Sequence, residues 1–96
     1  MVPKFSGDIE AAQTIALKAL SYLAADEDLL EPFLGSTGLL AGDLRAGATD
    51  SVFLAGVLDY FLQNEALLLA FAGASELAPE TIVRARQRLP GALNDQ

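Results

Sequence analysis

The chain has 96 residues, which suits one small domain with a modest core, and its formal net charge is −7 at pH 7. It contains neither His nor Cys, which excludes the commonest general bases, thiolate metal ligands and strong nucleophiles. Leu and Ala supply 18 and 17 residues, against 4 Val and 3 Ile. Because Leu and Ala favour helices and β-branched residues favour strands, the composition predicts an all-α bundle.

The first predicted helix covers residues 8–25, where apolar side chains recur at the helical period. These side chains are Ile9, Ala12, Ala16, Ala19, Leu20 and Leu23. A second helix is predicted at 27–35 with Asp26 as its N-cap, because the Asp side chain can accept from the free N–H groups of the first turn. An interior Pro32 removes a hydrogen bond from this helix, so a start at Asp28 with Glu31 as capping partner stays open.

The middle of the chain predicts a short helix at 40–47 and then a long apolar stretch. This stretch divides into helices at 51–63 and 65–73 if Asn64 acts as an N-cap. A single helix over 51–73 stays open, since the stretch holds neither Pro nor a central Gly.

Glycines and prolines set the remaining predicted boundaries. Gly35 and Gly73 end the second and fifth helices as residues suited to the C′ position. Pro79 begins a sixth helix over 79–89, because proline is well suited to the first helical position. Residues 91–96 are expected to form a frayed tail.

The chain matches itself when it is shifted by 38 residues. Residues 20–39 and 58–77 share eight identities in twenty positions, among them Tyr22 with Tyr60 and Gly35 with Gly73. The shift predicts a single domain over 1–96 built from a duplicated three-helix unit, with copies at about 9–47 and 47–85. The two copies are expected to superpose with the same order of helices.

No candidate site for chemistry emerges from the remaining residues. The densest acidic cluster is Asp26, Glu27, Asp28 and Glu31. Its spacing does not match a calcium loop, and acidic residues at a helix start are explained by the helix dipole. The eight glycines form no phosphate-binding loop. We therefore expect no metal, no cofactor and no enzymatic activity.

The apolar stretches are too short for a membrane span. The longest uninterrupted run, residues 66–74, has nine residues, whereas a spanning helix needs about 17–25. The first residues, MVPKFSGD, lack the apolar run of a secretory signal. The expectation is a cytoplasmic protein with no membrane partner.

Three segments carry a resemblance to a known family: FLGSTGLLAGDLR (33–45), VLDYFLQNEALLLAF (57–71) and LAPETIVRAR (77–86). They resemble a bacterial family of short helical proteins of unknown function. The resemblance covers about residues 9–91. It implies an all-helical fold and assigns no functional residue.

A candidate interaction surface lies where the two copies of the repeat differ. The fifth helix is apolar on all sides, whereas its counterpart, the second helix, keeps polar residues and a proline. In the shifted alignment Leu62, Ala66, Leu69 and Ala70 replace Ala24, Asp28, Glu31 and Pro32. Exposed apolar patches mark interfaces, so we expect either a homodimer or partner contact through this helix, or its central burial. The sequence thus predicts a small non-enzymatic, protein-binding or self-associating protein.

The alternative function is nucleic-acid binding by the last helix. Residues 71–86 read as helix, short turn and helix, the outline of a helix-turn-helix, and the last helix carries Arg84, Arg86 and Arg88. Against this, residues 1–80 hold 12 acidic residues and three basic ones. Nucleic acid is therefore the less favoured partner.

Overall fold

The computed structural model describes residues 4–90 of the chain. This part contains six α-helices and no β-strand. The helices are α1 (Lys4–Ala24), α2 (Glu27–Thr37), α3 (Ala41–Gly47), α4 (Ser51–Leu62), α5 (Glu65–Ser75) and α6 (Pro79–Gln87). The predicted all-α class and the six helices are confirmed. The tail expected at 91–96 lies outside the described residues.

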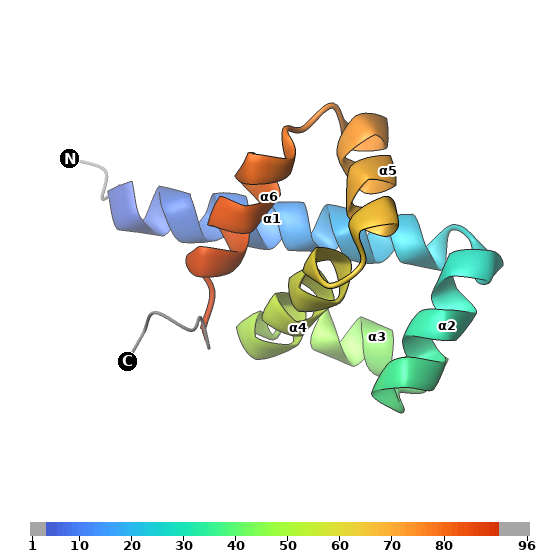
Figure 1. Ribbon diagram of the computed structural model, residues 1–96. Coiled ribbons are helices and arrows are strands. Elements are labelled where there is room, and N and C mark those ends of the chain that lie inside the picture. Colours follow the sequence, from blue (N-terminus) through green and yellow to red (C-terminus); the bar gives the residue numbers. More distant parts are fainter. Residues whose placement is uncertain (1–3, 91–96) are drawn as a thin grey trace.

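The bundle is assembled along its longest helix, α1. Helices α4 and α6 pack along it, and α4 also contacts α3, α5 and α6. Helix α2 packs chiefly against α1, to which it is joined by a tight turn. Figure 1 shows that α2 and α5 leave the same end of the molecule in opposite directions. This divergence creates the surface described in the next section.

The core consists of Leu, Ala and aromatic side chains from all six helices or their ends. Five of the six apolar residues predicted for the first helix are buried, whereas Ile9 is 43% exposed. Ile9 belongs to the N-terminal part of α1, and in Figure 1 the N-terminal turns of this helix extend beyond the helices that pack on it. Phe61 lies at the centre, 5.1 Å from Phe71 and 6.4 Å from Tyr22 between ring centroids. Aromatic rings of this kind dominate the burial in so small a domain.

Both predicted joints exist, and each has the expected N-cap. The Asp26 carboxylate accepts from the Asp28 N–H at 2.9 Å, and the Asn64 side-chain oxygen accepts from the Leu67 N–H at 3.4 Å. Helices α4 and α5 meet at an angle of 109°, so a single helix over 51–73 is excluded. The alternative start of α2 at Asp28 is wrong, because Asp26 caps a helix that begins at Glu27.

The predicted ends of α2 and α5 at Gly35 and Gly73 are wrong. Helix α2 continues to Thr37 and ends at Gly38, whose φ is 75°. Helix α5 continues to Ser75 and ends at Glu76, whose φ is 58°. A glycine inside a helix costs about 1 kcal/mol relative to alanine. The additional helical turn outweighs that cost, since further backbone groups gain hydrogen bonds.

The 38-residue shift also relates structural features of the two halves. Helices α2 and α5 each have 11 residues, begin after equivalent N-caps and end at equivalent left-handed residues, Gly38 and Glu76. Two ring contacts are equivalent as well, because Tyr22 corresponds to Tyr60 and Phe33 to Phe71. The ring centroids of Tyr22 and Phe71 are 5.5 Å apart, and those of Tyr60 and Phe33 are 4.9 Å apart. The first helices of the two halves differ in length, with 21 residues in α1 against 12 in α4. Duplication as the origin of this arrangement stays a prediction.

Substituting alanine at the interior helix glycines is expected to stabilise the protein. Gly35→Ala and Gly73→Ala should each raise the free energy of unfolding by about 0.5–1 kcal/mol, because a Cβ there meets no atom within 4 Å. The control is Gly38→Ala, which should lower it because alanine disfavours a φ of 75°. Urea unfolding monitored by circular dichroism measures all three. A loss of stability in the first two would indicate that the helices end at these glycines.

Candidate interaction surface

Helix α5 buries one side and exposes the other. Leu67, Phe71 and Ala72 are buried in the core, whereas Leu69 is 51% exposed. Ala66 and Ala70 are exposed as well, and no charged side chain lies between Glu65 and Glu76. Three of the four residues predicted for an interaction surface are therefore on the outside of the chain. The fourth, Leu62, is half-buried at the end of α4 and packs against the core.

Two of these residues line a groove between α2 and α5. The groove has a volume of about 330 Å³, and Ala66 and Ala70 form its α5 wall. Its remaining lining residues are Tyr22, Asp28, Leu29, Pro32, Tyr60, Asn64 and Leu67. Leu69 does not line it, so the predicted surface divides into a concave part beside α2 and a convex part around Leu69.

The groove is built from equivalent positions of the two halves. Eight of its nine lining residues form pairs separated by 38 positions: Tyr22 with Tyr60, Asp28 with Ala66, Leu29 with Leu67, and Pro32 with Ala70. The sequence comparison identified these positions but not their proximity. They lie together because α2 begins where α1 ends and α5 begins where α4 ends. From there α2 and α5 run in opposite directions, as Figure 1 shows.

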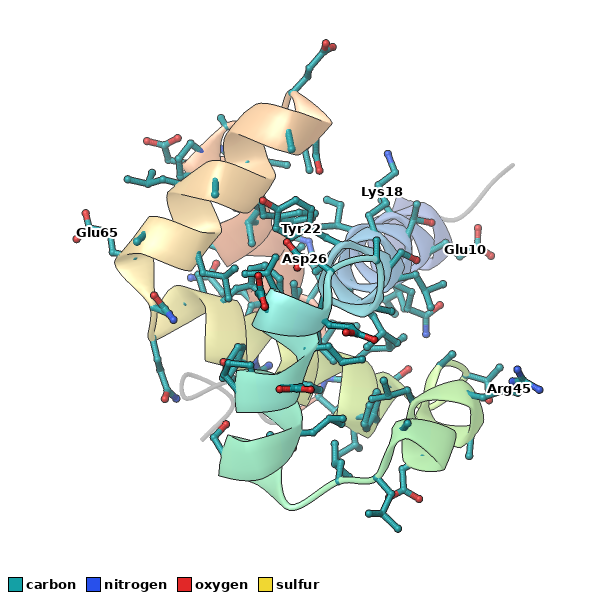
Figure 2. All side chains as sticks on the ribbon, turned by 90° about the vertical axis from the view of Figure 1, so that its right-hand side faces the viewer. Glu10, Lys18, Tyr22, Asp26, Arg45 and Glu65 are labelled. Carbon is teal, nitrogen blue, oxygen red and sulfur yellow. The ribbon has the colours of Figure 1, made fainter. Side chains whose placement is uncertain are left out.

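Tyr22 and Tyr60 give the groove an aromatic floor with polar atoms. Both residues are half-buried, and their rings pack against Phe71 and Phe33. Neither hydroxyl is a buried atom, and neither bonds to another described residue. In Figure 2 Tyr22 lies between α1 and α5, facing the end of the molecule at which α2 and α5 diverge. Tyrosines placed in this way combine apolar contact area with a hydrogen-bonding tip.

The charges near the groove are negative. Asp28 lines it, Glu27 and Glu31 lie on the same helix, and Glu65 begins α5 and projects outward in Figure 2. Within residues 9–90 no Lys or Arg side chain forms an ion pair with these four acids. Over the same range no group of His, Cys, Asp or Glu is arranged to hold a metal ion. This end of the molecule therefore carries uncompensated acidic charge.

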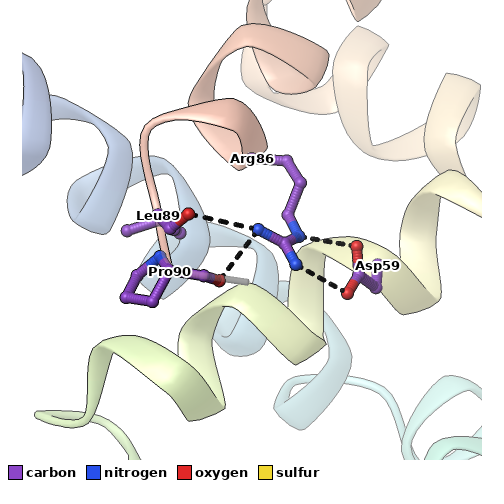
Figure 3. A network of polar contacts seen from close by, with 4 residues as sticks. All are labelled: Asp59, Arg86, Leu89 and Pro90. Atoms are coloured by element: carbon purple, nitrogen blue, oxygen red, sulfur yellow. Dashed lines mark hydrogen bonds and ion pairs between the residues drawn. The ribbon is translucent and has the colours of Figure 1, made fainter. Parts of the chain in front are cut away.

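The three arginines of the last helix do not form one exposed surface. Arg86 pairs with both carboxylate oxygens of Asp59, at 2.6 and 3.1 Å, and donates to the carbonyls of Leu89 and Pro90 (Figure 3). Its side chain is only 12% exposed. Arg86 therefore fastens the end of the described chain to α4. Arg84 and Arg88 are exposed, and Arg88 has an interaction of its own.

The helices were also compared with the length and composition of a membrane span. Within the described residues, no individual helix is both long and apolar enough to cross a membrane. Taken together, α4 and α5 reach the required length and composition, but they are bent by 109° at their joint and several of their apolar side chains lie in the core.

Comparison with known proteins identifies a family match. No curated protein and no solved structure matches the chain. The model of a family described as a protein of unknown function (DUF3572) matches residues 9–92. This confirms the resemblance to an uncharacterised family that the sequence segments carry. Since the match spans most of the chain, the protein belongs to the DUF3572 family of unknown function.

Proposed function

We propose that this chain is a non-enzymatic protein-interaction protein that associates with a second copy of itself through the convex side of α5. The observation that carries the proposal is Leu69, a large apolar side chain that is 51% exposed on a helix without charged residues between its ends. An exposed apolar helix side in a small domain gains free energy when a partner covers it.

The surroundings of Leu69 suit close contact between two helices. Gly73, one turn after Leu69 on the same helix, is exposed and has no side chain, so another helix can approach closely there. The nearest acids on the helix are at its ends, Glu65 and Glu76. Two such helices can therefore meet without bringing charged groups into the centre of the contact.

Other functional classes have weaker support. The nucleic-acid alternative relied on Arg84, Arg86 and Arg88 acting together, and the Arg86 guanidinium is occupied by Asp59. The overall charge of −7 also opposes contact with phosphates. Proteins without His or Cys can still be enzymes, but no group of Asp or Glu side chains in residues 9–90 is arranged to hold a metal ion for catalysis.

Leu69→Glu is expected to abolish self-association and leave the fold intact. Light scattering after gel filtration should give a mass above that of the 10.1 kDa monomer for the wild type, increasing with protein concentration. The variant should elute as a monomer, because each copy would place a carboxylate in the contact. Added salt should strengthen the wild-type association, since it screens the repulsion between two acidic chains.

Two further variants complete this test. Val52→Glu adds the same charge at a residue that is 66% exposed on α4, and it should retain the wild-type mass. Leu69→Gln removes the apolar contact without adding charge and should weaken association to a smaller extent. A wild type that is monomeric at every concentration, or a Val52→Glu variant with the same loss as Leu69→Glu, would contradict the proposal.

A further inference from the structure

The groove between α2 and α5 is a second candidate docking surface, distinct from the one around Leu69. We propose that it binds an amphipathic helix of a different protein, one that carries Lys or Arg beside its apolar side chains. This goes beyond self-association, because it requires a partner of opposite charge.

The shape of the groove suits a helix. Its walls are the diverging helices α2 and α5, which are not packed closely against each other. Ala66, Ala70 and Pro32 are small or compact wall residues, so the backbone of a third helix can come close. Residues 4–90 contain no strand whose edge an extended peptide could pair with, so strand addition is excluded, whereas an amphipathic helix can lie in a groove between two helices.

The lining offers both apolar anchoring and specificity. Leu29, Leu67 and the two tyrosine rings provide the apolar surface into which partner side chains insert. The hydroxyls of Tyr22 and Tyr60 have no hydrogen-bond partner among the described residues and can bond to the incoming helix. A volume of about 330 Å³ is at the lower end of the range for ligand sites, which suits a few anchoring side chains better than a large cofactor.

Charge complementarity determines the kind of partner. Asp28 lines the groove, and Glu27, Glu31 and Glu65 lie on α2 and α5, the two helices that form its walls, without an ion pair to a described cation. A basic partner would be attracted to this end of the molecule and held in register by ion pairs at the rim. A second copy is a poor occupant, because it brings a charge of −7 and its Arg86 is paired with its own Asp59.

Fluorescence anisotropy with two synthetic helical peptides tests this inference. Both peptides carry leucines along one side, and one has lysines flanking them whereas the other has glutamates at the same positions. The lysine peptide should bind at least tenfold more tightly. Its affinity should fall as NaCl rises from about 0.1 to about 1 M, which shortens the screening length from about 10 to about 3 Å. Salt is expected to have the opposite effect on self-association.

Variants of the groove locate the binding site. Ala70→Leu fills the groove and Asp28→Lys reverses its charge, and each should weaken binding of the lysine peptide at least tenfold. Both residues are exposed, so circular dichroism should show the wild-type helix content. The matched controls are Ala46→Leu on α3 and Glu10→Lys on α1, which lies away from the groove in Figure 2, and both should bind as the wild type does.

The outcomes separate the two proposals. Equal binding of both peptides, no binding of the lysine peptide, or unchanged binding by Ala70→Leu would overturn the groove proposal. The groove proposal would also be overturned if the wild type is a dimer and Ala70→Leu makes it monomeric whereas Leu69→Gln does not. A second copy of the chain would then occupy the groove. A monomeric wild type that binds the lysine peptide through the groove would remove self-association and support the present inference.

Discussion

Phe61→Ala is expected to lower the free energy of unfolding by about 3–5 kcal/mol, the usual cost of truncating a buried phenylalanine. The Phe61 side chain has 0% exposure. Its ring lies 5.1 Å from Phe71 and 6.4 Å from both Tyr22 and Tyr60, measured between ring centroids. Truncation would leave a cavity among rings contributed by α1, α4 and α5. Since small domains are stable by only about 5–15 kcal/mol, the variant should be close to unfolding at room temperature.

Urea denaturation followed by circular dichroism measures this loss. Val52→Ala is the control, because Val52 lies on the same helix and is 66% exposed, so its truncation should change stability by no more than about 0.5 kcal/mol. Similar losses for the two variants would show that Phe61 is not at the centre of the core. The same cluster supports the floor of the α2–α5 groove, so Phe61→Ala should also reduce peptide binding.

Gly47→Ala is expected to be the most damaging of the glycine substitutions, lowering stability by about 1–3 kcal/mol through overpacking. A Cβ at Gly47 would stand 2.5 Å from the Phe53 ring, closer than real Cβ contacts allow. Gly47 is buried where α3 meets α4, so either Phe53 or the whole of α3 has to move. This close approach, rather than an unusual φ angle, requires glycine here.

Gly42→Ala is the matched control for this prediction. It lies on the same helix, but a Cβ there meets no atom within 4 Å. Alanine should be neutral or stabilising at this position, because it has the higher helix propensity. In thermal melts the melting temperature should therefore fall for Gly47→Ala and stay constant or rise for Gly42→Ala. A Gly47→Ala variant as stable as the wild type would mean that α3 is not held against Phe53.

Much of the fold could be predicted because the signals are local. The caps Asp26 and Asn64 were identified from side-chain chemistry within one turn, and the buried side of α1 from its helical period. Pro79 was correctly placed at the start of α6 for the same reason. Each of these features depends on neighbours within a few residues along the chain.

The features that were missed depend on the competition between local signals or on distant residues. Gly35 and Gly73 favour helix ends, but Gly38 and Glu76 accept the left-handed conformation three residues later. The pair of Asp59 and Arg86 joins residues 27 positions apart and has no sequence signature. Of the candidate surface, Ala66, Leu69 and Ala70 were found from the differences between repeat halves, whereas the opposite wall of the groove depends on how α2 and α5 diverge.

Amide chemical shifts of the ¹⁵N-labelled protein during dilution test most directly whether the convex side of α5 is a contact between copies. As the concentration falls, the amides of residues 65–76 should change their shifts, while those of α3 and α6 stay nearly constant. Leu69→Glu should show the shifts of the dilute wild type at every concentration. Constant shifts throughout the dilution, or changes confined to helices other than α5, would contradict this account.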